Sequence, residues 1–547
     1  MRRTAALLLT SLIGGLLALV AAQQGTTGSK QTVREGGIFR IVFHTSSGLD
    51  AVDPALAFSV PSWAVLDTTC ARLLAYPDKP APDAYHYKPE VAAGLPDISR
   101  DRQTYTFKLR SGFRFSDGSP VRASAFERAI YRTLAPGVNS PGAQHTRDIV
   151  GADEVLEGRA SKVKGVTARG NTLTIRFKRP VPDFLHRTTT TFLCAVPPTL
   201  PADPEGVDAF HAAGPYYVTQ YRPGERVVLR RNPYYRGKRP HHVDGFDIDL
   251  RAVSPQDVPR RVDRGEADWG YTTSGIYFDP SLGLVAKYGI NQKRFFVRRG
   301  FTLRMLAFNA ARGAFRNNPS LRKAVNFALN RRAIINGTSG PRASVPTDQY
   351  LPPSMPGFRN ANIYPLERAN LKRARALARG HLPGERIVLY TSSAELPMKL
   401  GQIVQRQLAE IGLEVEVRGL PLHTASGAWF ARLAQQGEAW DLALGLWQPA
   451  YVDPYAYLNQ LLDPRYFGGT NFTRFQSRAY TRQMQRTAGV VQNGPRSRAY
   501  GALDVRLARE VAPLAAVDIL AEPTLVSGRV GCIVLRPVLD LTAVCLK

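Results

Sequence analysis

Alternating apolar and polar positions predict several strands in the first half of the chain. Every second residue is apolar over 105–109 and over 173–177, which is the period of a half-buried strand. A continuous apolar run over 38–43 has the length of a buried strand. The segment 216–230 reads as a hairpin, because two strand-like runs flank a Pro-Gly turn. One helix is expected in this half, over 61–74.

The second half has a helical period. After the capping pair Asn318-Pro319, apolar residues recur at helical spacing, and Gly337 is a candidate end of that helix. A further helix is expected over 397–412, and alternation over 413–417 then predicts a strand. A helix joined to a strand by a short connection is the unit of an α/β sheet, so we predict a mixed α/β protein.

Residues 1–22 have the pattern of an export signal. Arg2 and Arg3 precede an apolar run that ends in small residues, so we expect a mature chain that begins at Gln23. An uncleaved membrane anchor is the alternative, although the run is slightly short of the roughly 20 residues that span a bilayer. No cysteine for lipid attachment follows the run. We therefore expect a periplasmic or extracellular protein associated with the cell envelope.

Composition and charge narrow the class of protein. The 547 residues, 44% of them hydrophobic, suit a folded protein with several lobes. A formal net charge of +28 raises nucleic acid as a partner. The basic residues are scattered among acidic ones, however, and the export signal also argues against that role. We expect no nucleic-acid partner, and we attribute the charge to a compositional arginine bias or to attraction toward an anionic envelope.

The four cysteines form an even set in an exported chain, which permits disulfides. Cys532 and Cys545 lie in one short tail and are able to close it, which leaves Cys70 and Cys194 as the other pair. Buried free thiols are the alternative for each pair. No spacing of these cysteines is typical of a zinc site.

The sequence contains no nucleophile elbow, zinc-binding HExxH helix or phosphate-binding loop. The one histidine pair, His241-His242, follows a turn, and adjacent residues on extended backbone point apart, so a surface turn explains it better than a metal site. We expect that the protein is not an enzyme and that it binds neither a cofactor nor a metal ion. Catalytic groups far apart in sequence remain the alternative, such as those of an envelope hydrolase.

Several segments, in order along the chain, resemble the solute-binding family of ABC importers for oligopeptides, dipeptides and nickel. The most diagnostic is TYTFKLRSGFRFSDGSP, residues 104–120. The other matching segments are 36–54, 214–235, 306–329 and LPPSMPG at 351–357.

This resemblance implies an α/β fold of the two-lobed periplasmic-binding-protein type (type II, cluster C) with an extra small subdomain. Ligand would lie in the cleft between the lobes, and closure would bury it. The implied parts are a signal peptide (1–22), lobe I in a first part (23–75), its small subdomain (76–190), its second part (191–297), lobe II (298–512) and a C-terminal return to lobe I (513–547).

The resemblance also implies site residues. Trp447 falls on the family's cleft tryptophan, whereas Ala450 falls where peptide-binding members carry an aspartate that pairs with the ligand's amino terminus. This departure argues against ordinary peptides as ligands. A second segment, which follows Gly265, resembles the one leading to a cleft loop of lobe I, and core packing is the alternative for each aromatic residue. The ligand-binding candidates are Trp447, Gln448, Ala450, Tyr451, Trp269, Tyr271 and Thr272.

The resulting hypothesis is a monomeric receptor that captures a peptide-like or other small solute and delivers it to an ABC permease in the membrane. A sensor or scavenger of the same fold that takes no part in transport is the alternative, because the lipidation cysteine is missing.

Overall fold

The computed structural model describes residues 35–44, 49–80, 83–272, 274–420, 433, 439–490, 492–536 and 539–547. The predicted signal peptide lies outside these residues. Among the described helices, none combines the length and the apolar character that crossing a bilayer requires.

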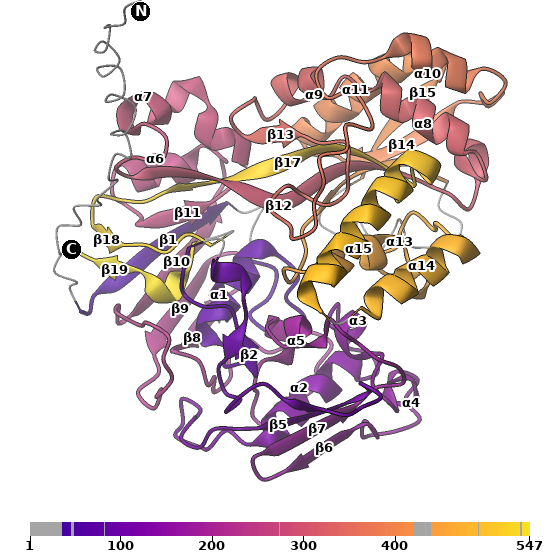
Figure 1. Cartoon of the computed structure of the whole chain (residues 1–547). Helices are drawn as coiled ribbons and strands as arrows, with labels where there is room; N and C mark the ends of the chain where they lie inside the picture. The colour runs from indigo at the N-terminus through magenta and orange to yellow at the C-terminus, as the bar shows by residue number, and fades with distance from the viewer. Residues whose placement is uncertain are drawn as a thin grey trace, which may run out of the picture.

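Lobe I, as we use the name, is built on a five-stranded mixed sheet (Figure 1). Its strand β1 (Ile38–His44) pairs in parallel with both of its neighbours, and the remaining pairs are antiparallel. The predicted hairpin over 216–230 forms the β8–β9 edge of this sheet. The strand order is β11 (Trp269–Tyr271), β1, β10 (Gly245–Ala252), β9 (Arg226–Arg231) and β8 (Tyr216–Arg222).

The small subdomain has its own four-stranded sheet and hydrophobic core. The two alternating segments of the sequence are its central pair, with Tyr105 opposite Ile175. Helix α2 (Ala123–Leu134) packs on this sheet and buries Phe126 and Ile130. The strand order is β4 (Asp97–Ile98), β5 (Thr104–Lys108), β7 (Thr172–Arg176) and β6 (Val166–Arg169).

Lobe II contains a six-stranded mixed sheet with helices around it (Figure 1). The strand order is β13 (Ser344–Pro346), β17 (Leu514–Leu525), β12 (Phe295–Phe308), β16 (Leu442–Trp447), β14 (Ile387–Ser392) and β15 (Val415–Leu420). The main helices are α8 (Pro319–Ala328), α9 (Arg331–Gly337), α10 (Leu371–Ala378), α11 (Glu395–Ala409), α13 (Tyr455–Leu462), α14 (Arg478–Ala488) and α15 (Asn493–Arg506).

Two long strands connect the lobes. β12 and β17 pair antiparallel over most of their length, and the register shifts between Arg299 and Leu303. At the far end of this ladder Trp269 of lobe I pairs with Val526, and the Ser527 N–H donates to the Asp268 carbonyl. A hinge between the lobes would therefore pass through this strand pair.

Two predicted helices are shorter than the sequence pattern indicates. The helix expected over 61–74 is α1 (Val60–Thr69), because the chain turns extended at Cys70 and the Thr69 carbonyl accepts from the Gly214 N–H. The pattern after Asn318 forms two helices, since Asn330 adopts a non-helical conformation and its side chain caps α9. The helix predicted over 397–412 is α11, which ends before Gly412 in left-handed geometry (φ +86).

Candidate functional site

A cavity of ≈ 170 Å³ lies between lobe I and lobe II. Both lobes contribute residues to its wall, so the cavity exists only when the two lobes are in contact. A larger groove of ≈ 820 Å³ runs along α11 and β15, but it is open and belongs to lobe II alone. The lining residues of the cavity are Val60, Trp63, Ala64, Asp67, Arg72, Tyr76, Ala84, Tyr85, 189–192, Phe301, 448–452, Arg536, Leu539 and Asp540.

The wall from lobe II is apolar and amide in character. It comprises Phe301 of β12 and residues 448–452, which leave the carboxyl end of β16. The Gln448 side-chain oxygen accepts from the Thr302 hydroxyl at 2.7 Å, which orients the amide. None of the described residues that lobe II contributes to this wall carries a charge.

The wall from lobe I carries the charges. Asp67 lies on α1, Arg72 follows that helix, and Arg536 and Asp540 come from the C-terminal return. Asp67 accepts from Arg72 Nη1 at 2.5 Å, and its other oxygen accepts from Arg536 Nη2 at 3.1 Å and from Arg239 at 2.8 Å. Segments more than 460 residues apart in the chain therefore meet at one carboxylate.

Asp67 and Asp540 are in different electrostatic states, although both are acidic residues of the same wall. Burial raises the pKa of Asp67, but the guanidinium groups of Arg72, Arg239 and Arg536 outweigh it and hold that pKa well below its usual value. Burial dominates at Asp540 and raises its pKa, with partial compensation from Arg536. The Asp67 carboxylate is therefore charged at neutral pH.

Several polar contacts join lobe II to the small subdomain and to the segment after α1. The Tyr451 hydroxyl donates to Asp183 Oδ2 at 2.7 Å, and Asp183 lies just before α5 (Phe184–Arg187). The backbone N–H of Val452 donates to the Tyr76 hydroxyl at 3.0 Å. His186 Nε2 lies 3.8 Å from Asp453 Oδ2. These contacts exist only when the lobes are together.

The structure brings three of the predicted site residues to the cavity, namely Gln448, Ala450 and Tyr451. Trp447 does not line it. The side chain of Trp447 is 6% exposed in the lobe II core, and its indole N–H donates to the Ala456 carbonyl. Neighbouring strand residues point to opposite faces, so Trp447 turns inward where Gln448 turns to the cleft.

The predicted residues of lobe I also lie outside the cavity wall. Trp269 is 2% exposed and packs edge-to-face on Phe43 in the lobe I core. Tyr271 is half-buried at the end of β11, and Thr272 is buried beside it. The core-packing alternative describes Trp269 better than a ligand contact does.

Sequence reasoning missed the residues that give the cavity its charge and most of its aromatic surface: Trp63, Asp67, Arg72, Tyr76, Tyr85, Arg536 and Asp540. None belongs to a motif. Arg72 and Arg536 resemble every other arginine of an arginine-rich chain, and only their meeting at Asp67 distinguishes them.

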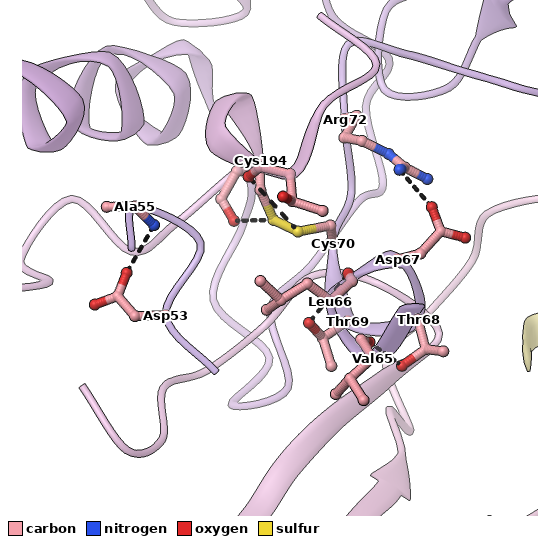
Figure 2. The surroundings of a disulfide bond; sticks show 12 residues. Asp53, Ala55, Val65, Leu66, Asp67, Thr68, Thr69, Cys70, Arg72 and Cys194 are labelled. Atoms are coloured by element: carbon pink, nitrogen blue, oxygen red, sulfur yellow. Dashed lines mark hydrogen bonds and ion pairs between the residues drawn. A yellow bond between two sulfur atoms is a disulfide. The ribbon is translucent and has the colours of Figure 1, made fainter. Parts of the chain in front are cut away.

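Two disulfides lie on lobe I. Cys70, two residues before Arg72, is joined to Cys194 (Figure 2). Cys532 is joined to Cys545 and ties β18 (Val530–Cys532) to β19 (Cys545–Leu546). Each bond therefore secures a segment that supplies charged groups to the cavity wall. Within the described residues, no cluster of three or more His, Cys, Asp or Glu side chains is arranged to hold a metal ion.

Comparison with known proteins agrees with this architecture. Residues 86–469 match the family described as bacterial extracellular solute-binding proteins, family 5 Middle. The oligopeptide-binding protein OppA of Bacillus subtilis (strain 168) is 25% identical over 413 residues, which cover 71% of this chain and 72% of that protein.

Solved structures share the fold. The clavulanic acid biosynthesis oligopeptide binding protein 2 superposes with a TM-score of 0.80 at 21% identity, covering 94% of this chain and 96% of its own. The periplasmic binding protein DppA from Helicobacter pylori, in complex with the peptide STSA, gives a TM-score of 0.75 at 19% identity and 94% and 99% coverage. The predicted two-lobed α/β fold is confirmed.

Proposed function

Because this chain belongs to the bacterial extracellular solute-binding proteins of family 5, we propose that it captures a small solute between its two lobes and delivers it to the permease of an ABC importer. The observation that carries the proposal is the cavity itself, whose wall comes from both lobes. A ligand that touches both lobes stabilises the closed form over the open form, and a permease can recognise that difference.

The size and chemistry of the cavity favour a small solute. Its ≈ 170 Å³ is below the range of about 300–1,000 Å³ that is typical of sites for drug-sized ligands. Ala450 offers no carboxylate to a ligand's amino group at the position where the resemblance would place one. Relatives are named for oligopeptides, but we propose a solute whose volume does not exceed that of an amino acid or a dipeptide, whatever its chemical class.

We further propose that the protein acts as a monomer outside the cytoplasm, after export by residues 1–22, without catalysing a reaction. The lobe boundaries that we propose are those given above, with the hinge at β12 and β17. The supporting observation is that each of the three main sheets has its own hydrophobic core.

Native mass spectrometry after mild purification from several growth media tests the proposal. We expect a mass excess of one small molecule that disappears after unfolding and refolding. Small-angle scattering should then show a larger radius of gyration for the stripped protein, and reloading should restore the smaller one. Deletion of the gene should abolish uptake of the identified solute by the host. Protein that is ligand-free from every medium, with the same radius throughout, would contradict the proposal.

A further inference from the structure

His186 lies at the seam where lobe II meets the small subdomain and the segment after α1. It belongs to α5, and its side chain is 15% exposed. Its Nδ1 lies 3.2 Å from the hydroxyl of Tyr76, which follows β2 (Leu74–Ala75), and its Nε2 lies 3.8 Å from Asp453 Oδ2 of lobe II. The Tyr451 ring of lobe II stacks on the imidazole with the ring centroids 6.3 Å apart. One imidazole of the small subdomain therefore meets lobe II through a carboxylate and an aromatic ring.

The hydrogen bonds of Tyr76 select one form of this imidazole. The Tyr76 hydroxyl accepts from the Val452 N–H of lobe II at 3.0 Å. A hydroxyl that accepts on its oxygen still has one proton to donate, and His186 Nδ1 lies within reach of it. Nδ1 accepts that proton only when it carries none itself. The neutral imidazole with its proton on Nε2, the nitrogen that faces Asp453, therefore completes a chain of contacts from lobe II through Tyr76 to α5.

The carboxylates near His186 do not favour a charged imidazole. Asp453 accepts two hydrogen bonds from Arg496, at 2.9 Å from Nη2 and at 3.2 Å from Nε, so a guanidinium already balances its charge. Asp183 is balanced in the same way by Arg187 Nε at 2.7 Å. A proton on His186 would add a third positive charge beside two carboxylates that are already paired, in a seam that excludes most water.

The pKa of His186 reflects these surroundings. Burial lowers that pKa, the Asp453 carboxylate raises it by less, and Arg496 lowers it again, so it lies below its ordinary value. When the lobes separate, water replaces the contacts from lobe II, and an exposed imidazole has a pKa of about 6.5. The open form therefore binds one proton more than the closed form below that pH. The titratable and charged groups that face the imidazole are Tyr76, His86 and Tyr87 from the segment after α1, Asp183 beside α5, and Tyr451, Asp453 and Arg496 from lobe II.

We propose that His186 is a proton-sensitive latch, which joins α5 and Tyr76 to lobe II while it is neutral and releases the seam when it takes up a proton. The closed form is then fully favoured above about pH 6.5 and is progressively lost as the pH falls below it. One proton makes opening about tenfold more favourable at pH 5.5 than at pH 7.5. The release of a solute in acid rests on the proposed function, whereas the state of the imidazole does not.

NMR of the full-length protein as purified, labelled isotopically in its histidines, measures the state of this imidazole. The signals of His186 are those that are missing from the His186→Asn variant. We expect the form with the proton on Nε2 at pH 7.5, and a ring that is still neutral at pH 6.0, where most exposed histidines are charged. A ring that is charged at pH 6.0, or that carries its proton on Nδ1 at pH 7.5, would overturn the latch.

The solute that co-purifies with the protein reports on opening. Its dissociation after dilution, followed by native mass spectrometry, should be about tenfold faster at pH 5.5 than at pH 7.5. The His186→Asn variant should lose most of this acceleration, because its amide oxygen still accepts from Tyr76 but does not take up a proton in this range. His242→Asn is the matched control and should keep the full acceleration, since His242 pairs with Glu35 of lobe I, away from the seam.

Two results of the dissociation experiment contradict the latch. Equal rates at the two pH values would show that opening takes up no proton. An acceleration that survives His186→Asn would assign the proton to another group, such as His145, which also packs on the Tyr451 ring. Both results leave the receptor function in place. Absence of any solute from every preparation would instead overturn the receptor function, and the NMR titration would still decide the latch.

Discussion

Replacing Tyr451 with phenylalanine should weaken solute binding more than it weakens either lobe. In the closed protein the Tyr451 hydroxyl donates to Asp183 Oδ2 at 2.7 Å across the seam between lobe II and the small subdomain. In an open form water would satisfy both groups, so the bond contributes to closure and not to the fold of one lobe. Tyr451→Phe keeps the ring against the cavity and removes this bond, together with the longer one of 3.3 Å that Gln460 Nε2 of lobe II donates to the same hydroxyl.

The expected change in the dissociation constant follows from the groups that the Tyr451–Asp183 hydrogen bond joins. A hydrogen bond to a charged group contributes about 1.5–3 kcal/mol, which corresponds to about a 10- to 150-fold change in the closing equilibrium. Asp183 keeps two contacts with Arg187, at 2.7 and 3.2 Å, after the tyrosine hydroxyl is lost. The carboxylate is therefore not left unpaired, and we expect the lower end, an increase of about tenfold in the dissociation constant.

The assay follows dissociation of the co-purified solute by native mass spectrometry after dilution, since weaker closure should act mainly on the dissociation rate. Tyr500→Phe is the control. It removes a buried tyrosine hydroxyl that donates to Asn459 Oδ1 at 2.8 Å, but both of these residues belong to lobe II. The control should lower the urea midpoint and leave dissociation unchanged. Equal dissociation rates for Tyr451→Phe and the wild type would refute the view that this contact holds the lobes together.

Two further predictions concern buried groups near the seam. Trp447→Ala should destabilise the protein by about 3–5 kcal/mol in urea unfolding, because a 6%-exposed core indole is lost; unchanged stability with lost solute binding would instead place Trp447 in the site. Burial, with a smaller contribution from Arg187, lowers the pKa of the His145 imidazole to about 3, from about 6.5 when unfolded. The unfolded chain thus binds the extra proton as the pH falls below about 6.5, and by pH 5 this costs about 2 kcal/mol of stability relative to pH 7.5. His145→Phe should remove that part of the acid sensitivity, whereas an identical pH profile for the variant would contradict the assignment.

Local patterns were sufficient for part of the secondary structure, but they did not predict the long strands β12 and β17 or the helices α13, α14 and α15. The alternation over 105–109 and 173–177 became the paired strands β5 and β7, because a period of two already places one face toward a core. Asn318 caps α8 through its side chain, which accepts from the Leu321 N–H, as the Asn-Pro pair predicts. Helix α1 ends at Thr69, earlier than predicted, because Gly214 from a distant segment contacts the Thr69 carbonyl. The helical pattern after Asn318 is interrupted at Leu329, because Asn330 caps a second helix within the same apolar pattern.

The functional site was only partly accessible to such reasoning. The resemblance located the segment 447–451, but it could not tell which of its neighbours turns toward the cavity. Trp447 packs inward and donates to Ala456, whereas Gln448 is oriented toward the cleft by Thr302. Aromatic residues satisfy a core and a binding site equally well in sequence, and only the neighbouring atoms distinguish the two.

The sequence by itself determined the α/β class, the positions of several strands and helices, and the family resemblance, because these depend on residues close together in the chain. Tertiary structure alone decided the chemistry of the cavity. Asp67 and Arg536 are 469 positions apart and belong to no common sequence motif, yet Asp67 Oδ2 lies 3.1 Å from Arg536 Nη2. Burial acts on both the Asp67 and the Asp540 carboxylate, but the three guanidinium groups around Asp67 lower its pKa whereas burial dominates at Asp540 and raises its pKa, and these surroundings exist only once the chain has folded.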